Sequence, residues 1–213
     1  AGGIMTPKII SLGVSVPEKS YTQREIFDSL GYPHHFWPIF RDSGINKRHL
    51  AVPMGTKMTW QKACELYQEH AMKLSLSAVK QALEGYDKDK IGCIIFGSCT
   101  GYLCPSLNYL IAKELDLPHD CEHIPIIGDG GCAGAAPDIV SAVSYVKLNP
   151  EKLALAISCE VCSVDFFPES DYPDRPFPDP TNKYQLLRAN AIFADGASAI
   201  LVGHDDNLRH PYV

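Results

Sequence analysis

Cys132 combines a nucleophilic side chain with a sequence context that predicts a sharp turn at the start of a helix. Glycines precede it and small residues follow it, in the run GGCAGAA at residues 130–136. Small neighbours permit unusual backbone conformations and let a substrate approach the sulfur closely. A helix N-terminus offers unpaired N–H groups and a positive partial charge, and both stabilise a thiolate. Two interpretations follow from this local pattern: a nucleophile for acyl groups, or a buried cysteine in a tight turn.

The remaining cysteines raise the question of disulfides or of a metal site. Most stand in apolar segments, as Cys93 does, where a reduced cysteine packs as a small hydrophobic residue. Cys159 and Cys162 have the C-x-x-C spacing of redox and metal pairs. However, they follow an apolar, strand-like run, and no second pair stands at zinc spacing. We therefore expect reduced cysteines in an intracellular protein and no metal.

The composition is that of an ordinary globular chain. Of the 213 residues, 46% are hydrophobic and 21% are charged, which argues against wholesale disorder and fibrous repeats. No apolar run reaches the roughly 18 residues of a membrane span, and the first residues lack the pattern of a signal peptide. The net charge is −6 without a basic block, which argues against a nucleic-acid partner. We expect a cytoplasmic protein with small-molecule chemistry.

Segments with strand-like and helix-like periodicity alternate along the chain. Strands are predicted at residues 8–16, 91–97, 124–128, 152–159 and 190–202. Helices are predicted at residues 21–30, 59–84, 105–115 and 133–148. Thr22 is the expected cap of the first helix, and Pro105 is expected to open the third. This alternation predicts an α/β domain with a mixed, mostly parallel sheet and helices on both of its faces.

Five motifs occur in a specific order along the chain. They are SGINKRH at 43–49, SCTGYLCPS at 98–106, GCAG at 131–134, SCEVC at 158–162 and AIFADGASA at 191–199. In this order and spacing they resemble the type III polyketide synthases, the chalcone-synthase-like group of the thiolase-fold condensing enzymes. The resemblance runs from about residue 8 to residue 203. It implies that residues 1–213 form the N-terminal half of a thiolase-like fold.

The resemblance also implies a reaction, the decarboxylative Claisen condensation of polyketide biosynthesis. A starter acyl group passes from CoA to a cysteine, malonyl-CoA loses CO2, and the resulting carbanion attacks the thioester. Cys132 matches the nucleophile, and Phe193 matches the phenylalanine that lines the site of malonyl decarboxylation. Acyl-CoA and malonyl-CoA are the expected substrates of a homodimer, and no further cofactor is expected.

Other positions acquire roles only through this resemblance. Cys99 matches a cavity position, and Cys104 matches the residue that crosses the dimer interface to line the partner's cavity. Cys162 and Asp165 match positions whose side-chain volume sets the product chain length in the family. Without the family each of these is an ordinary core or loop residue. The Asp-Gly pair at residues 195–196 is expected to be structural.

The sequence departs from the family in its length and in one loop. The family's catalytic His and Asn lie in a second half, and this sequence ends before that half would begin. A lone cysteine lacks a base and donors for the thioester oxygen, so a second-half polypeptide is expected. The stretch at residues 168–183 is longer than the family norm and is expected to be an insertion loop at the surface.

The expected contacts to CoA are also incomplete. The basic residues that hold CoA phosphates in plant members align with His35, Pro38 and Asp42. Lys47 and Arg48 remain nearby as weak candidates for this contact, and both are equally consistent with solvated surface charge. The loss of the usual basic residues leaves an acyl carrier protein open as an alternative carrier of the substrate.

Two other functions share these features. A ketoacyl-synthase-III-like enzyme would use Cys132 for a single condensation rather than several. A non-catalytic, thiolase-like subunit would stabilise a catalytic partner. The missing His and Asn favour the non-catalytic subunit, whereas the intact GCAG turn opposes it.

Overall fold

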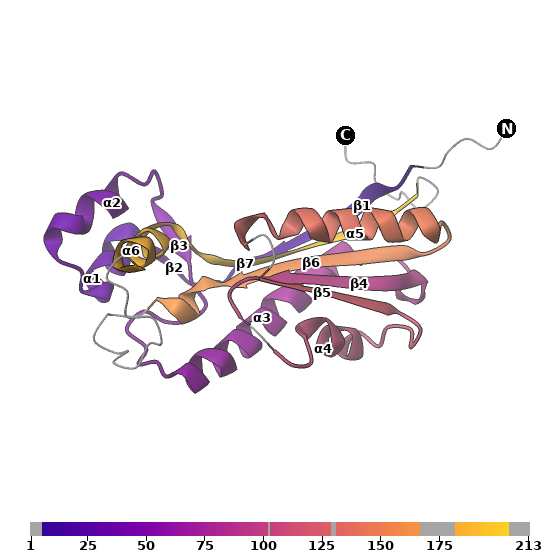
Figure 1. Cartoon of the computed structure of the whole chain (residues 1–213), viewed down its shortest axis with the longest axis horizontal. Coiled ribbons are helices and arrows are strands. Elements are labelled where there is room, and N and C mark those ends of the chain that lie inside the picture. The colour runs from indigo at the N-terminus through magenta and orange to yellow at the C-terminus, as the bar shows by residue number, and fades with distance from the viewer. Residues whose placement is uncertain (1–5, 102, 129–130, 167–181, 205–213) are drawn as a thin grey trace. The chain divides into compact units, whose positions relative to one another are not determined.

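The chain forms two compact units, which we describe separately. The computed structural model describes residues 6–101, 103–128, 131–166 and 182–204. Unit 1 is drawn from the segments Ala1–Ser15, Ala71–Glu160 and Gly196–Val213, and unit 2 from Val16–His70 and Val161–Asp195. Their helices and strands are labelled in Figure 1.

Unit 1 is built on a five-stranded mixed sheet. Its strand order is β1 (Lys8–Ser15), β7 (Asp195–Gly203), β6 (Leu153–Val161), β4 (Ile91–Ser98) and β5 (Glu122–Ile127). β4 runs parallel to both β5 and β6, whereas β1 pairs antiparallel with β7. Every residue of the apolar strand β4 is buried, as expected for a parallel strand with helices on both faces.

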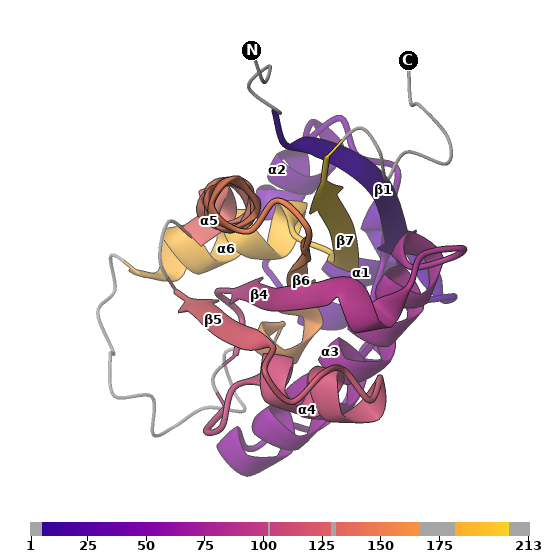
Figure 2. The same cartoon turned by 90° about the vertical axis from the view of Figure 1, so that its right-hand side faces the viewer.

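Helices cover both faces of this sheet. Figure 2 shows α5 (Ala135–Leu148) on one face and α4 (Leu107–Glu114) on the other. On the α5 face, Ala142 and Val146 share a buried cluster with Cys93 and Ile95 of β4. The long helix α3 (Trp60–Ala82) contributes the part that begins at Ala71 to unit 1. A side chain at Gly13 of β1 would overlap the carbonyl oxygen of Ala78, so α3 and β1 pack at backbone distance.

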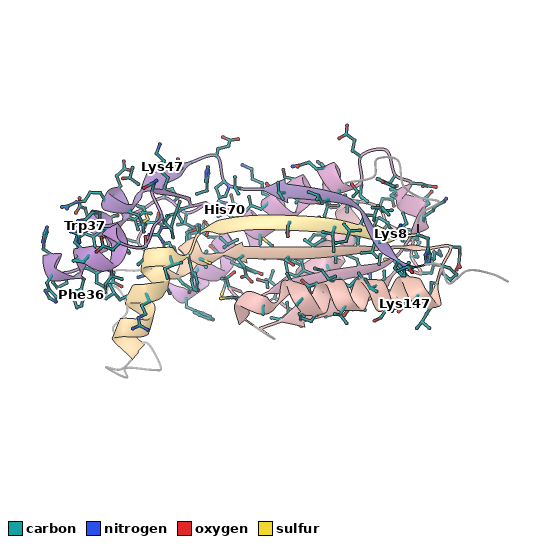
Figure 3. The ribbon with its side chains drawn as sticks, turned by 90° about the horizontal axis from the view of Figure 1, so that it is seen from above. Lys8, Phe36, Trp37, Lys47, His70 and Lys147 are labelled. Atoms are coloured by element: carbon teal, nitrogen blue, oxygen red, sulfur yellow. The ribbon has the colours of Figure 1, made fainter. Side chains whose placement is uncertain are left out.

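Unit 2 consists of short elements around an aromatic core. Strand β2 (Ser20–Thr22) pairs with β3 (Lys47–His49). The unit also contains the helices α1 (Gln23–Leu30), α2 (Trp37–Arg41) and α6 (Asn182–Ile192). The 3-10 turns η1 (His34–Phe36) and η4 (Cys162–Asp165) belong to it as well. Phe27 of α1 packs edge-on against Phe40 and Trp37 of α2. Figure 3 shows Phe36 and Trp37 together where η1 meets α2.

Most predicted elements are confirmed. Thr22 caps α1 as expected: its side chain accepts from the N–H of Glu25, and its own N–H donates to the Glu25 carboxylate at 2.7 Å. The helix predicted at 59–84 is α3, and the one predicted at 133–148 is α5 after the turn η3 (Gly131–Ala133). Three-residue β2 and β3 were not predicted, because strands this short carry no measurable periodicity.

Two predicted boundaries are wrong. Residues 190–192 end α6 instead of starting a strand, because Leu187, Asn190 and Ala191 are buried at helical spacing. Pro105 lies before α4 instead of opening it, since Ser106 occupies the N-cap.

The expected insertion loop at 168–183 lies outside the described residues, apart from its last two residues, which begin α6. Within the described residues, no helix is long and apolar enough to cross a membrane.

The close contact between β1 and α3 predicts that position 13 tolerates no side chain. Gly13→Ala should lower the free energy of unfolding by about 1–3 kcal/mol, because the added methyl group meets the backbone of Ala78. Denaturant unfolding of both proteins in the same assembly state measures the effect. Ser15→Ala at the end of the same strand is the control. Equal stability of Gly13→Ala and the parent would contradict this packing.

Candidate active site

Cys132 lies in the turn η3 (Gly131–Ala133) that connects β5 to α5, and its side chain is exposed. Gly131 has a φ of 49°, a left-handed conformation that glycine adopts without strain. The N–H of Gly134 donates to the carbonyl of Gly131 at 3.0 Å and closes the turn. The thiol therefore stands just before the first turn of a 14-residue helix, as the sequence predicted.

The helix α5 is buried along only one of its faces. Among the described residues, α5 buries only Asp138, Ala142 and Val146. Its outer face leaves Val140 64% and Leu148 83% exposed. The helix predicted at residues 133–148 is thus confirmed, and apolar side chains of its outer face are exposed.

The other cysteines differ from Cys132 in their surroundings. Cys99, Cys104 and Cys132 are exposed, whereas Cys93, Cys121, Cys159 and Cys162 are buried. Burial raises the pKa of Cys93 to about 12 and that of Cys121 to about 11, so both are protonated at neutral pH. Thiols in this state are poor nucleophiles.

The carboxyl ends of parallel strands meet at one edge of the unit 1 sheet. Cys99 directly follows β4, and Cys132 follows β5. The N–H of Gly128 donates to the carbonyl of Ser98 at 2.8 Å, which ties the ends of these two strands together. This edge is where open α/β sheets place their binding sites.

Glu160, near the end of β6, holds the segment that carries Cys99. Its carboxylate accepts from the N–H of Cys99 at 2.9 Å and from the hydroxyl of Thr100 at 2.7 Å. A carboxylate that accepts from both backbone and side chain fixes a loop more firmly than neutral hydrogen bonds do. The exposed thiol of Cys99 therefore has a defined position.

Asp138, in the first turn of α5, fastens this helix to the sheet. The hydroxyl of Ser158 on β6 donates to one Asp138 oxygen at 2.7 Å, and the other oxygen has no partner among the described residues. A side chain at Gly97 of β4 would overlap the carboxylate. Burial raises the pKa of Asp138 to about 6, and the charge of Glu160 acts in the same direction. The sequence analysis missed this residue, although an Asp six positions after Cys132 in an apolar helix was a visible signal.

Cys104 lies between β4 and α4 in unit 1, and the remaining predicted site residues belong to unit 2. Phe193 follows α6 and is 39% exposed. In η4, Cys162 belongs to the buried core whereas Asp165 is exposed. Lys47 and Arg48 are neighbours on β3. Lys47 is exposed, whereas Arg48 is buried, with 2% of its surface exposed. Arg48 is therefore not a solvated surface charge.

Asp195 has the structural role that the sequence suggested. Its carboxylate accepts from the N–H of Ala51 at 2.6 Å and from the N–H of Ser163 at 2.8 Å, and the hydroxyl of Ser163 also donates to it. Burial raises its pKa, while these hydrogen bonds act in the opposite direction. Asp195 therefore connects three segments of unit 2 at the start of β7.

Residues 43–206 match the family model described as "Chalcone and stilbene synthases, N-terminal domain". The chain belongs to this family. A Bacillus subtilis (strain 168) protein whose name refers to chalcone synthase is 30% identical over 220 residues, which cover 94% of this chain and 57% of that protein. "Alpha-pyrone synthesis polyketide synthase-like Pks18" of Mycobacterium tuberculosis is 28% identical over 190 residues, covering 84% of this chain and 45% of the relative.

A solved structure shows the same fold. The C-terminal type III polyketide synthase domain of "Steely1", a type I/III hybrid from Dictyostelium, superposes with a TM-score of 0.79 at 23% identity and covers 98% of this chain and 58% of that one. The chain therefore has the thiolase-like fold expected for the N-terminal half of a type III polyketide synthase. It spans about half the length of the curated relatives that it matches.

The buried Asp138 predicts an unusual pH dependence for this chalcone synthase family member. Its pKa rises from 3.8 to about 6 on folding, so the folded state binds more protons between these two values. This group's contribution to stability is therefore lost as the pH rises through that window, by on the order of 3 kcal/mol in total. Asp138→Asn should flatten the decline.

Thermal unfolding of parent and variant across this pH range, in the same assembly state, measures the difference. Asp120→Asn, which removes an exposed carboxylate, is the control. If Asp138→Asn and the parent showed parallel pH profiles, the buried carboxylate would not be the group that titrates.

Proposed function

We propose that this chain supplies the nucleophile half of a type III polyketide synthase, which condenses an acyl starter with malonyl-CoA. The observation that carries the proposal is the exposed thiol of Cys132 at the head of α5, within the segment that matches the family model. The relatives named as polyketide synthases support the same reaction class.

The proposed reaction starts with acyl transfer to Cys132. Its thiolate attacks the thioester carbonyl of acyl-CoA, a sulfur–carbon bond forms, and CoA leaves as its thiol after taking up a proton. Malonyl-CoA then loses CO2, and the electron pair left behind attacks the acyl carbonyl. A carbon–carbon bond forms, and the cysteine sulfur leaves with its electron pair. The product is an acyl-CoA extended by two carbons.

The remaining predicted residues take supporting roles in this proposal. Phe193 lines the site of malonyl decarboxylation, and the exposure of its side chain supports such a contact. Cys99, Cys104, Cys162 and Asp165 shape the product cavity. Lys47 is the better candidate for a CoA phosphate, because it is exposed whereas its neighbour Arg48 is buried. An acyl carrier protein remains the alternative source of the acyl group.

We further propose that a second half, of the kind present in the longer relatives, completes the catalytic site. The helix α5 exposes Ile139, Val140 and Leu148, and β1 exposes Leu12 and Val14 on the sheet face opposite α3. Apolar surface of this extent is typical of an interface. The second half would also supply the base and the oxyanion donors that Cys132 needs.

We also propose a homodimer. β5 is an end strand of the described sheet, so one row of its main-chain groups is available for pairing with a second copy. Cys104 would then reach the partner's cavity, which is consistent with its exposure.

The nucleophile assignment predicts a selective loss of acyl transfer. Cys132→Ala, in the protein completed by its second half, should abolish acylation by acyl-CoA while the fold is retained, because the turn already consists of small residues. Intact-protein mass spectrometry detects the acyl adduct. Cys99→Ala removes another exposed thiol at the same sheet edge and should keep the adduct on Cys132. An acyl adduct on Cys132→Ala would refute the assignment.

The exposed apolar faces predict that the chain functions in a larger assembly. About 400 Å² of uncovered apolar surface corresponds to roughly 10 kcal/mol of forgone burial at about 25 cal/mol per Å². This is comparable to the stability of a whole domain. The isolated chain should therefore self-associate or bind a second-half polypeptide, as measured by size-exclusion chromatography with light scattering. A monomer of 23.4 kDa with a cooperative thermal transition would contradict this expectation.

A further inference from the structure

The segment between α6 and β7 is held by buried polar side chains of unit 2. The side-chain amide of Gln23 donates to the carbonyl of Ala191 at 2.8 Å, and one guanidinium nitrogen of Arg48 donates to the carbonyl of Phe193 at 2.7 Å. Asp195 follows, and its carboxylate accepts hydrogen bonds from the N–H groups of Ala51 and Ser163. Gln23, Arg48 and Asp195 are each at most 4% exposed. Every second residue from Ala191 to Asp195 is therefore fixed by a hydrogen bond that involves a buried polar side chain.

Phe193 lies at the centre of this arrangement. Its N–H donates to the carbonyl of Ala189 at 2.9 Å, and its own carbonyl accepts from Arg48. Both main-chain polar groups are thus bonded, whereas 39% of the residue remains exposed. The backbone is anchored while the side chain is presented at the surface of the unit.

Arg48 is itself held from two sides. Its backbone pairs with Tyr21 in the β2–β3 ladder, and its guanidinium lies 5.4 Å from the ring centre of Phe166. Burial lowers its pKa to about 10, with Asp195 and Cys162 acting in the opposite direction, so it remains a cation at neutral pH. Its other two nitrogens have no partner among the described residues. A charge buried with so few hydrogen bonds is costly to keep for packing alone.

We propose that Arg48 is a positioning residue, which fixes the backbone of Phe193 so that its ring meets the malonyl group in a defined orientation. The role of Phe193 in this statement rests on the proposed function. Arg48 does not bind the CoA phosphates, because its guanidinium is buried and bonded to the main chain. Loss of Arg48 should therefore slow decarboxylation and leave the KM for malonyl-CoA unchanged.

The first measurement is independent of activity. Hydrogen–deuterium exchange of the peptide spanning residues 189–197 should accelerate by about tenfold or more in Arg48→Met, because a charge-assisted hydrogen bond is lost. Exchange in α5 should stay unchanged. Lys57→Met removes an exposed cation of the same unit and is the matched control. Unchanged exchange at residues 189–197 in Arg48→Met would overturn the proposal.

The second measurement uses the protein completed by its second half. In Arg48→Met, release of CO2 from malonyl-CoA should fall by about tenfold with an unchanged KM, while acylation of Cys132 stays within about twofold of the parent. Arg48→Lys should recover part of the loss, since an ammonium group can still donate to the carbonyl of Phe193. Equal losses of CO2 release and of Cys132 acylation would indicate general damage and would overturn the positioning role. A raised KM for malonyl-CoA with no loss of rate would also overturn it.

Two further outcomes distinguish a failure of the Arg48 proposal from a failure of the proposed function. If Arg48→Met does not fold, Gln23→Leu tests the same segment through the carbonyl of Ala191, with the same expected direction in exchange and in CO2 release. If the parent protein is never acylated at Cys132, the proposed function fails. In that case the exchange measurement alone decides whether Arg48 holds Phe193 in place.

Discussion

The buried carboxylate of Asp138 fixes the position of α5 on the sheet, and through α5 the position of Cys132. Ser158 of β6 donates to it, and only a glycine at position 97 of β4 leaves room for it. This contact lies in the first turn of the helix, close in sequence to the nucleophile turn. A shift of this helix end would move the turn η3, which directly precedes α5 and carries the thiol of Cys132.

Buried or half-buried polar side chains hold main-chain segments in both units. Glu160 holds the segment of Cys99 in unit 1, and Gln23, Arg48 and Asp195 hold the segment of Phe193 in unit 2. Each such group is costly to bury unless it is bonded, so each bond strongly favours one backbone conformation. The loops that carry the predicted site residues thereby become rigid supports for exposed side chains. Rigid supports are what a reaction between precisely placed groups requires.

In our proposal the catalytic groups are divided between this chain and a second half. This half holds the candidate nucleophile, on a helix whose outer face is apolar and exposed. In our proposal the second half covers this face and brings the base and the oxyanion donors with it. Folding and catalysis would then depend on the same interface, because the surface that stabilises α5 also completes the site.

The sequence by itself determined the fold class, most elements and the position of Cys132 at the head of a helix. These features depend on periodicity and on local turn chemistry, which short segments encode, and on motifs in a specific order. Only the tertiary structure decided that Arg48 is buried and bonded to Phe193, 145 residues away, and that Asp138 faces Gly97 and Ser158. The tertiary structure also decided that residues 190–192 belong to the end of α6, although an apolar run had indicated a strand. The burial of a side chain and its distant partners arise from packing between elements, which no local pattern contains.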